Sequence, residues 1–120
     1  MAQILVVEDD TMIREMLEAH FTRSGFDVAT AEDGVQALLR VRSVRPDVIL
    51  MDMGLPKLNG WQTTQRLRAR QETAKIPIVA LTAYAMDEDR KRALHIGCNA
   101  FEAKPINFVS LMGTIHRLLA

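Results

Sequence analysis

This chain of 120 residues has few of the residue types that mark specialised protein classes, and each scarcity excludes something. The single cysteine, Cys98, leaves no partner for an internal disulfide and no spacing for a cysteine-bound metal. No apolar run approaches the roughly 20 residues of a membrane-spanning helix, and the first residues lack a signal-peptide pattern. Lys+Arg and Asp+Glu both number 15, so the net charge indicates neither a nucleic-acid partner nor an acidic membrane. We therefore expect one cytoplasmic domain over residues 1–120.

Short apolar runs alternate with amphipathic segments along the chain, which is typical of a parallel α/β sheet. The apolar runs predict strands near residues 3–7, 26–30, 47–51, 77–81 and 100–103. The segments between and after them predict helices near residues 11–24, 34–44, 60–71, 85–96 and 107–119. Residues suited to cap the starts of these helices are Asp10, Asp33 and Asn107. This alternation predicts a doubly wound fold with five strands and five helices.

Charged or hydroxyl-bearing residues stand at the ends of four of the predicted strands. Glu8 and Asp9 follow the first strand, and Asp52 ends the third. Thr82 follows the fourth strand, and Lys104 follows the fifth. In a parallel sheet these ends lie at one edge, where ligands of doubly wound folds bind. We therefore expect the carboxylates, the hydroxyl and the ammonium to converge on a site for a divalent cation and a phosphoryl group.

Magnesium is the cation that this set of oxygen donors suits, because Mg²⁺ takes one or two carboxylates together with water and a phosphate oxygen. Asp9 and Asp52 are the expected direct ligands, and Glu8 is expected to act through water. Lys104 can neutralise the Asp52 region and contact a phosphoryl oxygen, to which Thr82 can donate a hydrogen bond. Taken singly, the lysine and the threonine could be ordinary surface and strand-end residues, so the interpretation depends on the whole set.

Four segments together resemble the receiver domain of response regulators in two-component signalling, and the resemblance extends over the whole chain. They are residues 4–10 (ILVVEDD), 50–56 (LMDMGLP), 81–83 (LTA) and 104–105 (KP). The resemblance implies a flavodoxin-like sheet in the strand order 2-1-3-4-5. It also implies that Asp52 accepts a phosphoryl group from a histidine kinase or a phosphotransfer protein, and that a main-chain carbonyl of Gly54 is a further Mg²⁺ ligand. The peptide bond between Lys104 and Pro105 is expected to be cis.

The resemblance also implies a switch. Thr82 would move toward the phosphoryl group, and Phe101 would rotate inward, changing a partner surface formed by residues 85–96, 100–103 and 107–119. Two positions would set the lifetime of the phosphorylated form. Gly54 leaves room for water above the acyl phosphate, whereas Tyr84 places a ring near it, and we expect Tyr84 to dominate.

Within the family, the chain is most similar to stand-alone DivK-type regulators, and its Met1 and its end just past the last helix favour a protein that acts alone. We expect it to catalyse only its own phosphorylation and dephosphorylation, to act on a downstream protein, and to be a monomer or a weak dimer. Two alternatives remain: a receiver cut from a hybrid histidine kinase, and a small phosphatase with an aspartate nucleophile. Phosphatases of the haloacid-dehalogenase type need a second aspartate where this chain has Gly54.

The first and last predicted helices carry more apolar residues than a core face needs. In the first helix the core stripe is expected to be Ile13, Leu17, Phe21 and Ser24. An apolar shoulder beside it predicts a docking face for the kinase or phosphotransfer protein: Met12, Met16 and Ala19. In the last helix the expected core residues are Phe108, Met112, Ile115 and Leu119, and the expected output or dimer face carries Leu111 and Leu118.

Overall fold

A parallel sheet runs through the middle of the protein in a computed structural model that describes residues 2–83 and 86–120. Within these residues the strands are β1 (Gln3–Val7), β2 (Asp27–Ala31), β3 (Val48–Asp52), β4 (Ile78–Thr82) and β5 (Ala100–Ala103). Their order across the sheet is β2-β1-β3-β4-β5, which confirms the expected order. Every strand begins and ends within one residue of its predicted bounds.

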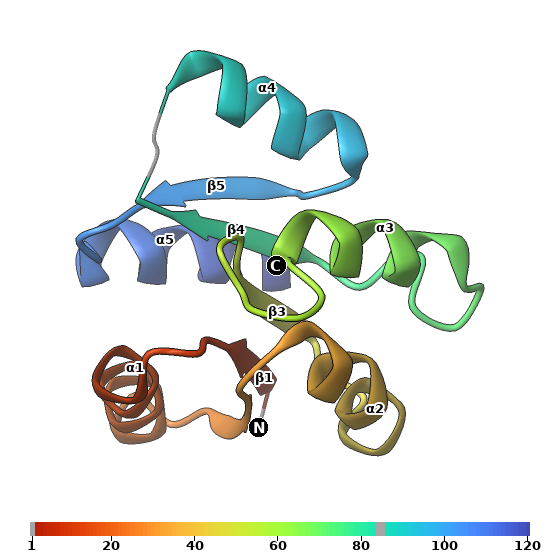
Figure 1. Cartoon of the computed structure of the whole chain (residues 1–120). Coiled ribbons are helices and arrows are strands. Elements are labelled where there is room, and N and C mark those ends of the chain that lie inside the picture. Colours follow the sequence, from red (N-terminus) through yellow and green to blue (C-terminus); the bar gives the residue numbers. More distant parts are fainter. Residues whose placement is uncertain (1, 84–85) are drawn as a thin grey trace.

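Helices cover both faces of this sheet (Figure 1). They are α1 (Thr11–Arg23), α2 (Gly34–Val44), α3 (Gly60–Ala69), α4 (Asp87–Ile96) and α5 (Phe108–Leu119). The core residues of α1 and α5 belong to one apolar cluster, and those of α2, α3 and α4 belong to another. The predicted caps are confirmed, since Asp10, Asp33 and Asn107 each accept a hydrogen bond from a first-turn amide.

The two apolar clusters are separated by the sheet and share its central strands. In β1, Ile4 and Val6 point into the cluster under α1 and α5, whereas Leu5 and Val7 point into the other. All five residues of β3 and all five of β4 are buried. This is why the central strands are continuous apolar runs in the sequence, because a strand covered on both faces has no solvent side for polar residues.

Two expectations about helix faces are wrong. Ser24 is exposed, and its hydroxyl donates a hydrogen bond to the His20 carbonyl at the end of α1. Leu111 is fully buried and therefore cannot belong to an output face, while Val109 is 86% exposed. The buried stripe of α5 is formed by Leu111 together with Thr114 and Ile115, which follow it by three and four residues as helical periodicity requires.

The loop from β3 to α3 returns close to the end of β3, and Gly60 makes this possible. The Gly60 amide donates a hydrogen bond to the Met53 carbonyl over 3.3 Å. A Cβ at this position would overlap the carbonyl oxygen of Asp52, so a larger residue would push α3 away from the strand end. Asn59 and Gln62 fix the first turn of α3 through a reciprocal capping box. The start of α3 is thereby held beside Asp52.

Candidate functional site

The acidic side chains lie at the carboxyl ends of β1 and β3, where the strand order reverses. Glu8 and Asp9 follow β1, and Asp52 is the last residue of β3. One carboxylate oxygen from each of these three residues lies within 4.8 Å of the others. Glu8 is 1% exposed and Asp52 is 6% exposed, whereas Asp9 is at the surface. The arrangement places two buried carboxylates beneath an accessible one, with hard oxygen donors directed at one point.

Lys104 brings the positive charge to this cluster from the end of β5. Its Nζ lies 2.7 Å from Glu8 Oε1 and 3.4 Å from Asp52 Oδ1. The amide of Lys104 donates to the Thr82 carbonyl over 2.8 Å, so the neighbouring ends of β4 and β5 are tied together. Thr82 is itself 6% exposed and lies at the end of β4, next to β3. The structure therefore brings Asp52, Lys104 and Thr82 to the same edge of the sheet.

The protonation of this cluster is perturbed. Burial raises the pKa of Glu8 to about 7, and the nearby Asp52 adds to the rise, while the hydrogen bond from Lys104 opposes it. The pKa of Lys104 is also raised; burial by itself would lower it, but the hydrogen bond to Glu8 and the charges of Glu8 and Asp52 outweigh burial. One ammonium does not compensate the carboxylates fully, so the donor set fits an added divalent cation such as Mg²⁺.

Gly54 lies next to the carboxylate of Asp52. The Asp52 Oδ1 accepts a hydrogen bond from the Gly54 amide over 3.1 Å. A Cβ at Gly54 would lie 3.8 Å from the same oxygen, so any side chain at this position would stand over the carboxylate. The role of the Gly54 carbonyl as a metal ligand stays a prediction.

Phe101 and Tyr84 were the other expected functional positions. The Phe101 ring is 6% exposed and belongs to the apolar cluster under α2, α3 and α4, and the guanidinium carbon of Arg90 lies 5.4 Å from its centroid. Tyr84 lies outside the described residues. The peptide bond between Lys104 and Pro105 is cis, as expected.

Arg14 is a residue of the site that sequence reasoning missed. Its guanidinium donates hydrogen bonds to the carbonyls of Glu8 and Asp9, over 3.0 and 3.4 Å, and pairs with Glu32 over 3.4 Å. The Asp10 amide donates to the other carboxylate oxygen of Glu8 over 3.2 Å. Arg14 thus fixes the main chain of the acidic loop from the first turns of α1. The sequence offered one signal for this role, namely an arginine that follows the three acidic residues of the loop by four to six positions.

Comparison with known families matches residues 4–116 to the response regulator receiver domain. The chain belongs to this family. The receiver is 34% identical to the polar-differentiation response regulator DivK of Brucella anthropi, over 97% of this chain and 94% of that protein. It is 31% identical to the DNA-binding dual master transcriptional regulator RpaA of Synechocystis, over 99% of this chain but only 49% of RpaA.

A solved relative was determined with a bound metal ion. The receiver domain of the sensor histidine kinase PA1611 from Pseudomonas aeruginosa was solved with a magnesium ion coordinated in its active site cleft. It is 36% identical to this chain, with a TM-score of 0.90, and the match covers 98% of this chain and 97% of that one. Receiver domains of this family therefore bind Mg²⁺, and this receiver has an acidic cluster that fits the ion.

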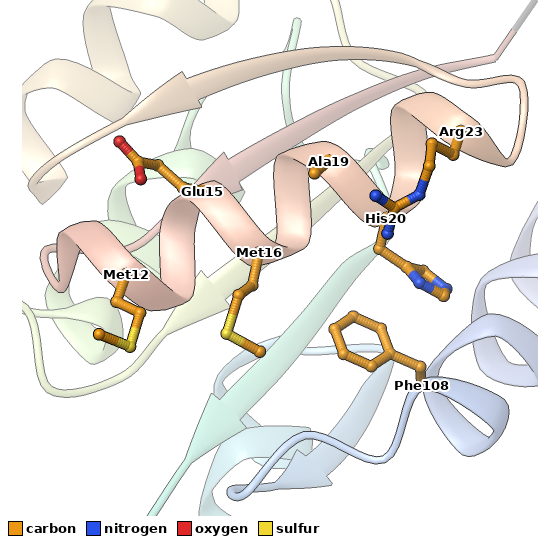
Figure 2. A pocket seen from close by; sticks show the side chains of 7 residues that line it. All are labelled: Met12, Glu15, Met16, Ala19, His20, Arg23 and Phe108. Carbon is orange, nitrogen blue, oxygen red and sulfur yellow. The ribbon is translucent and has the colours of Figure 1, made fainter.

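An apolar groove of the receiver runs from Lys104 along α1. A hollow of about 190 Å³ is lined by Lys104, Met16 and Phe108 among others, and a second hollow of about 370 Å³ continues past Met16 and Phe108 to Met12. Met12 and Met16 extend from the same side of α1, and the Phe108 ring packs on His20 at 4.1 Å (Figure 2). Met12 is 72% exposed and Met16 is 49% exposed. In residues 2–83 and 86–120, no helix is long and apolar enough to cross a bilayer.

Proposed function

We propose that this receiver is a phosphorylation-dependent signalling switch in which Asp52 is the phosphoacceptor. The observation that carries the proposal is the convergence of Glu8, Asp9 and Asp52 within 4.8 Å, with the Lys104 ammonium 3.4 Å from Asp52. Asp9 and Asp52, together with the Gly54 carbonyl, would hold Mg²⁺, and Glu8 would act through water. The bound ion would neutralise charge on the oxygens of the transferring phosphoryl group.

The protein residues have distinct tasks in the transfer. An Asp52 oxygen attacks the phosphorus of a phosphohistidine in line, the P–N bond breaks, and the imidazole of the donor leaves with the bonding electrons. Lys104 and the Thr82 hydroxyl then stabilise the negative oxygens of the acyl phosphate. Water later attacks the phosphorus, the P–O bond to Asp52 breaks, and inorganic phosphate leaves, which restores the Asp52 carboxylate. Gly54 leaves the acyl phosphate open to that water, and Tyr84 would restrict it.

The phosphoryl group would change the surface that partners recognise. Thr82 would be drawn toward the phosphoryl group, and the space behind it would be filled by Phe101. The Phe101 ring is already buried. Phosphorylation would therefore stabilise the buried conformation of this ring and would not need to turn an exposed ring inward. The affected surface is formed by α4, β5 and α5, where a downstream protein would bind.

The donor protein would dock on the groove along α1. The groove leads directly to Lys104, and Met12 and Met16 offer flexible apolar side chains that adapt to a partner helix. A partner helix that carries the phosphohistidine and lies against α1 would bring it toward Asp52.

We propose that the receiver acts alone in the cytoplasm through protein contacts, as a monomer or weak dimer that needs neither nucleic acid nor a membrane. Its similarity to DivK, with 94% of that protein covered, supports this. Its only catalysis would be its own phosphorylation and dephosphorylation. A receiver module of a hybrid histidine kinase is the second candidate, because the PA1611 receiver of a sensor histidine kinase is 36% identical.

Trp61 fluorescence tests the proposal, because its ring lies at the start of α3 and 4.2 Å from the guanidinium carbon of Arg92 on α4. Beryllofluoride, which mimics an acyl phosphate, should change the emission only when Mg²⁺ is present. The response should be lost in Asp52→Asn and kept in Asp27→Asn, a matched change at an exposed position. Absence of any response by fluorescence and by amide NMR shifts would contradict the proposed switch and favour a domain that acts without phosphorylation.

A further inference from the structure

Charge is separated along this neutral chain. Residues 1–33 contain eight Asp and Glu residues but two Lys and Arg residues, whereas residues 34–75 contain eight Lys and Arg residues but three Asp and Glu residues. The second segment includes α2, β3 and α3. The zero net charge therefore conceals a basic side of the molecule, which the composition alone could not reveal.

Part of this basic side is a groove between α2 and α3, with a volume of about 460 Å³. Its four cationic side chains are Arg42, Lys57, Arg66 and Arg70, and no acidic residue lines it. Lys57 pairs with Asp33 over 3.7 Å, with its own side chain 72% exposed. Within residues 2–83 and 86–120, the other three cations form no ion pair with an acidic side chain. The groove thus carries positive charge that the fold does not neutralise.

The groove also has an apolar strip between its cations. Val35 and Leu39 lie on adjacent turns of α2 and are 47% and 67% exposed. Below them, Leu38 and Leu58 are 8% exposed and close the floor. Residues 35 to 42 of α2 span about 10 Å, so the strip matches roughly two turns of a bound helix. Covering Val35 and Leu39 by a partner would remove apolar surface from water, which favours association.

We propose that the groove between α2 and α3 binds an acidic amphipathic helix of a partner protein. The apolar side of that helix would cover Val35 and Leu39, and its carboxylates would pair with Arg42, Arg66 and Arg70. Helices commonly bind in grooves through anchors three to four residues apart, which is the spacing that Val35, Leu39 and Arg42 offer. The opposite charges would also speed association and orient the partner.

Other occupants fit this groove less well. A single nucleic-acid strand uses aromatic side chains for base stacking, and the residues that line the groove include none. A second copy of the chain could offer α1, where Glu15 and Glu18 flank Met12 and Met16. However, contact between two different faces of one molecule is head-to-tail, so it would build a ring or an open filament rather than a simple two-fold dimer.

A synthetic peptide of about 16 residues, long enough for marginal helicity, serves as the probe. It has leucines at positions i, i+4, i+7 and i+11, glutamates around them, and a fluorescein label. One control peptide has the same composition with scattered leucines, and another has lysine in place of glutamate. Anisotropy of the full chain with each peptide measures affinity, and amide NMR shifts locate the contact.

The acidic amphipathic peptide should bind saturably, with shifts at Val35, Leu39 and Arg42, and more weakly as salt rises. The double substitution Arg66→Glu with Arg70→Glu should weaken binding about tenfold or more. The matched reversal of Lys91 and Arg117, two exposed cations outside the groove, should leave it unchanged. Leu39→Ser should weaken binding without altering the fold, because this side chain is mostly exposed.

Any one of four binding results would overturn the proposal. They are no saturable binding, equal binding of the scattered or lysine peptide, shifts confined to another surface, and tighter binding of a single-stranded oligonucleotide in the same groove. Self-association that the Arg66 and Arg70 substitutions abolish would also overturn it, because the occupant would then be a second copy. None of these results depends on phosphorylation of Asp52, so the outcome is separate from that of the proposed switch.

Discussion

The acidic edge at the ends of β1 and β3 is tightly held by buried contacts, whereas the helix α4 buries little of its surface. At the edge, Glu8 and Asp52 are almost fully buried, and Lys104, Gly54 and Asp10 hydrogen-bond or pair with them. Among the described residues, no buried polar side-chain atom lacks a partner. Helix α4, by contrast, buries only Ala93, whereas α2 buries four residues.

Two arginines of α4 lie over aromatic rings and help to attach the helix, beside the packing of Ala93 and the hydrogen bond from Arg68 to the Gly97 carbonyl. Arg90 lies over Phe101 of β5, and Arg92 lies over Trp61 of α3. Such contacts are worth about 0.5–1 kcal/mol each where water has access. The start of α4 also has no side-chain cap at Met86. A rigid site and a loosely attached helix suit a switch, because a small change in free energy at the site can shift only an element that costs little to move.

The largest expected effect comes from replacing one leucine by alanine in each of the two regions. Leu50→Ala, two residues before Asp52 and fully buried, should lower the free energy of unfolding by about 2–5 kcal/mol. Leu94→Ala on α4, where the side chain is 47% exposed, should change it by about 0.5 kcal/mol or less. Chemical denaturation of both variants measures the difference. A loss at Leu94 as large as at Leu50 would show that α4 is not loosely attached.

A second test uses the raised pKa of Glu8. Because the pKa of Glu8 is raised from its ordinary value of 4.5 to about 7 in the folded protein, the folded state binds more protons than the unfolded state between these pH values. The contribution of protonated Glu8 to the stability of the fold is complete below about pH 4.5 and is lost as pH rises through about 7. Mg²⁺ should restore it, so the rise in Tm caused by Mg²⁺ should be greater at pH 8 than at pH 5.5.

Glu8→Gln is the control for this measurement, since an amide cannot titrate. Both the pH slope over this window and its reversal by Mg²⁺ should become smaller in that variant, while the cooperativity of unfolding stays the same. If wild type and Glu8→Gln have parallel pH profiles, the proton on Glu8 does not contribute to the stability of the acidic edge.

Much of the fold could be predicted because local signals agreed with the global structure. The apolar runs of β1 and β3 are strands covered on both faces, and Asp10 and Asn107 each cap the helix that their position indicated. The strand order came from the family resemblance rather than from the residues. Leu111 was misplaced because apolar residues nearly surround α5, so periodicity alone does not choose the buried side.

The candidate site was predictable for the residues at strand ends and not for those that reach it from helices. Topology alone brings Glu8, Asp52 and Lys104 together. Arg14 and the pair of Arg92 with Trp61 depend on how helices pack and which rotamers result, and no sequence pattern specifies this. The basic groove escaped for a related reason: α2 and α3 are separated by a strand, and only folding places their arginines side by side.

The smallest expected effect is the most direct test of how α4 is attached. Arg92→Ala removes the guanidinium 4.2 Å from the Trp61 ring, and should lower the free energy of unfolding by about 1 kcal/mol. The emission of Trp61 should shift to longer wavelength because the ring gains contact with water. Lys91→Ala, an adjacent exposed cation, should change neither quantity.

Amide hydrogen exchange decides whether that loss is local. If the arginine holds α4 against α3, exchange in Arg92→Ala should accelerate in residues 87–96 and stay unchanged in β1 and β3, because the acidic edge is stabilised by its own buried contacts. Equal acceleration in both regions would mean that α4 and the acidic edge open as one unit. The two regions would then differ in how they are packed but not in how stable they are. A phosphoryl group on Asp52 could not move α4 without also loosening the acidic edge to which the group is attached.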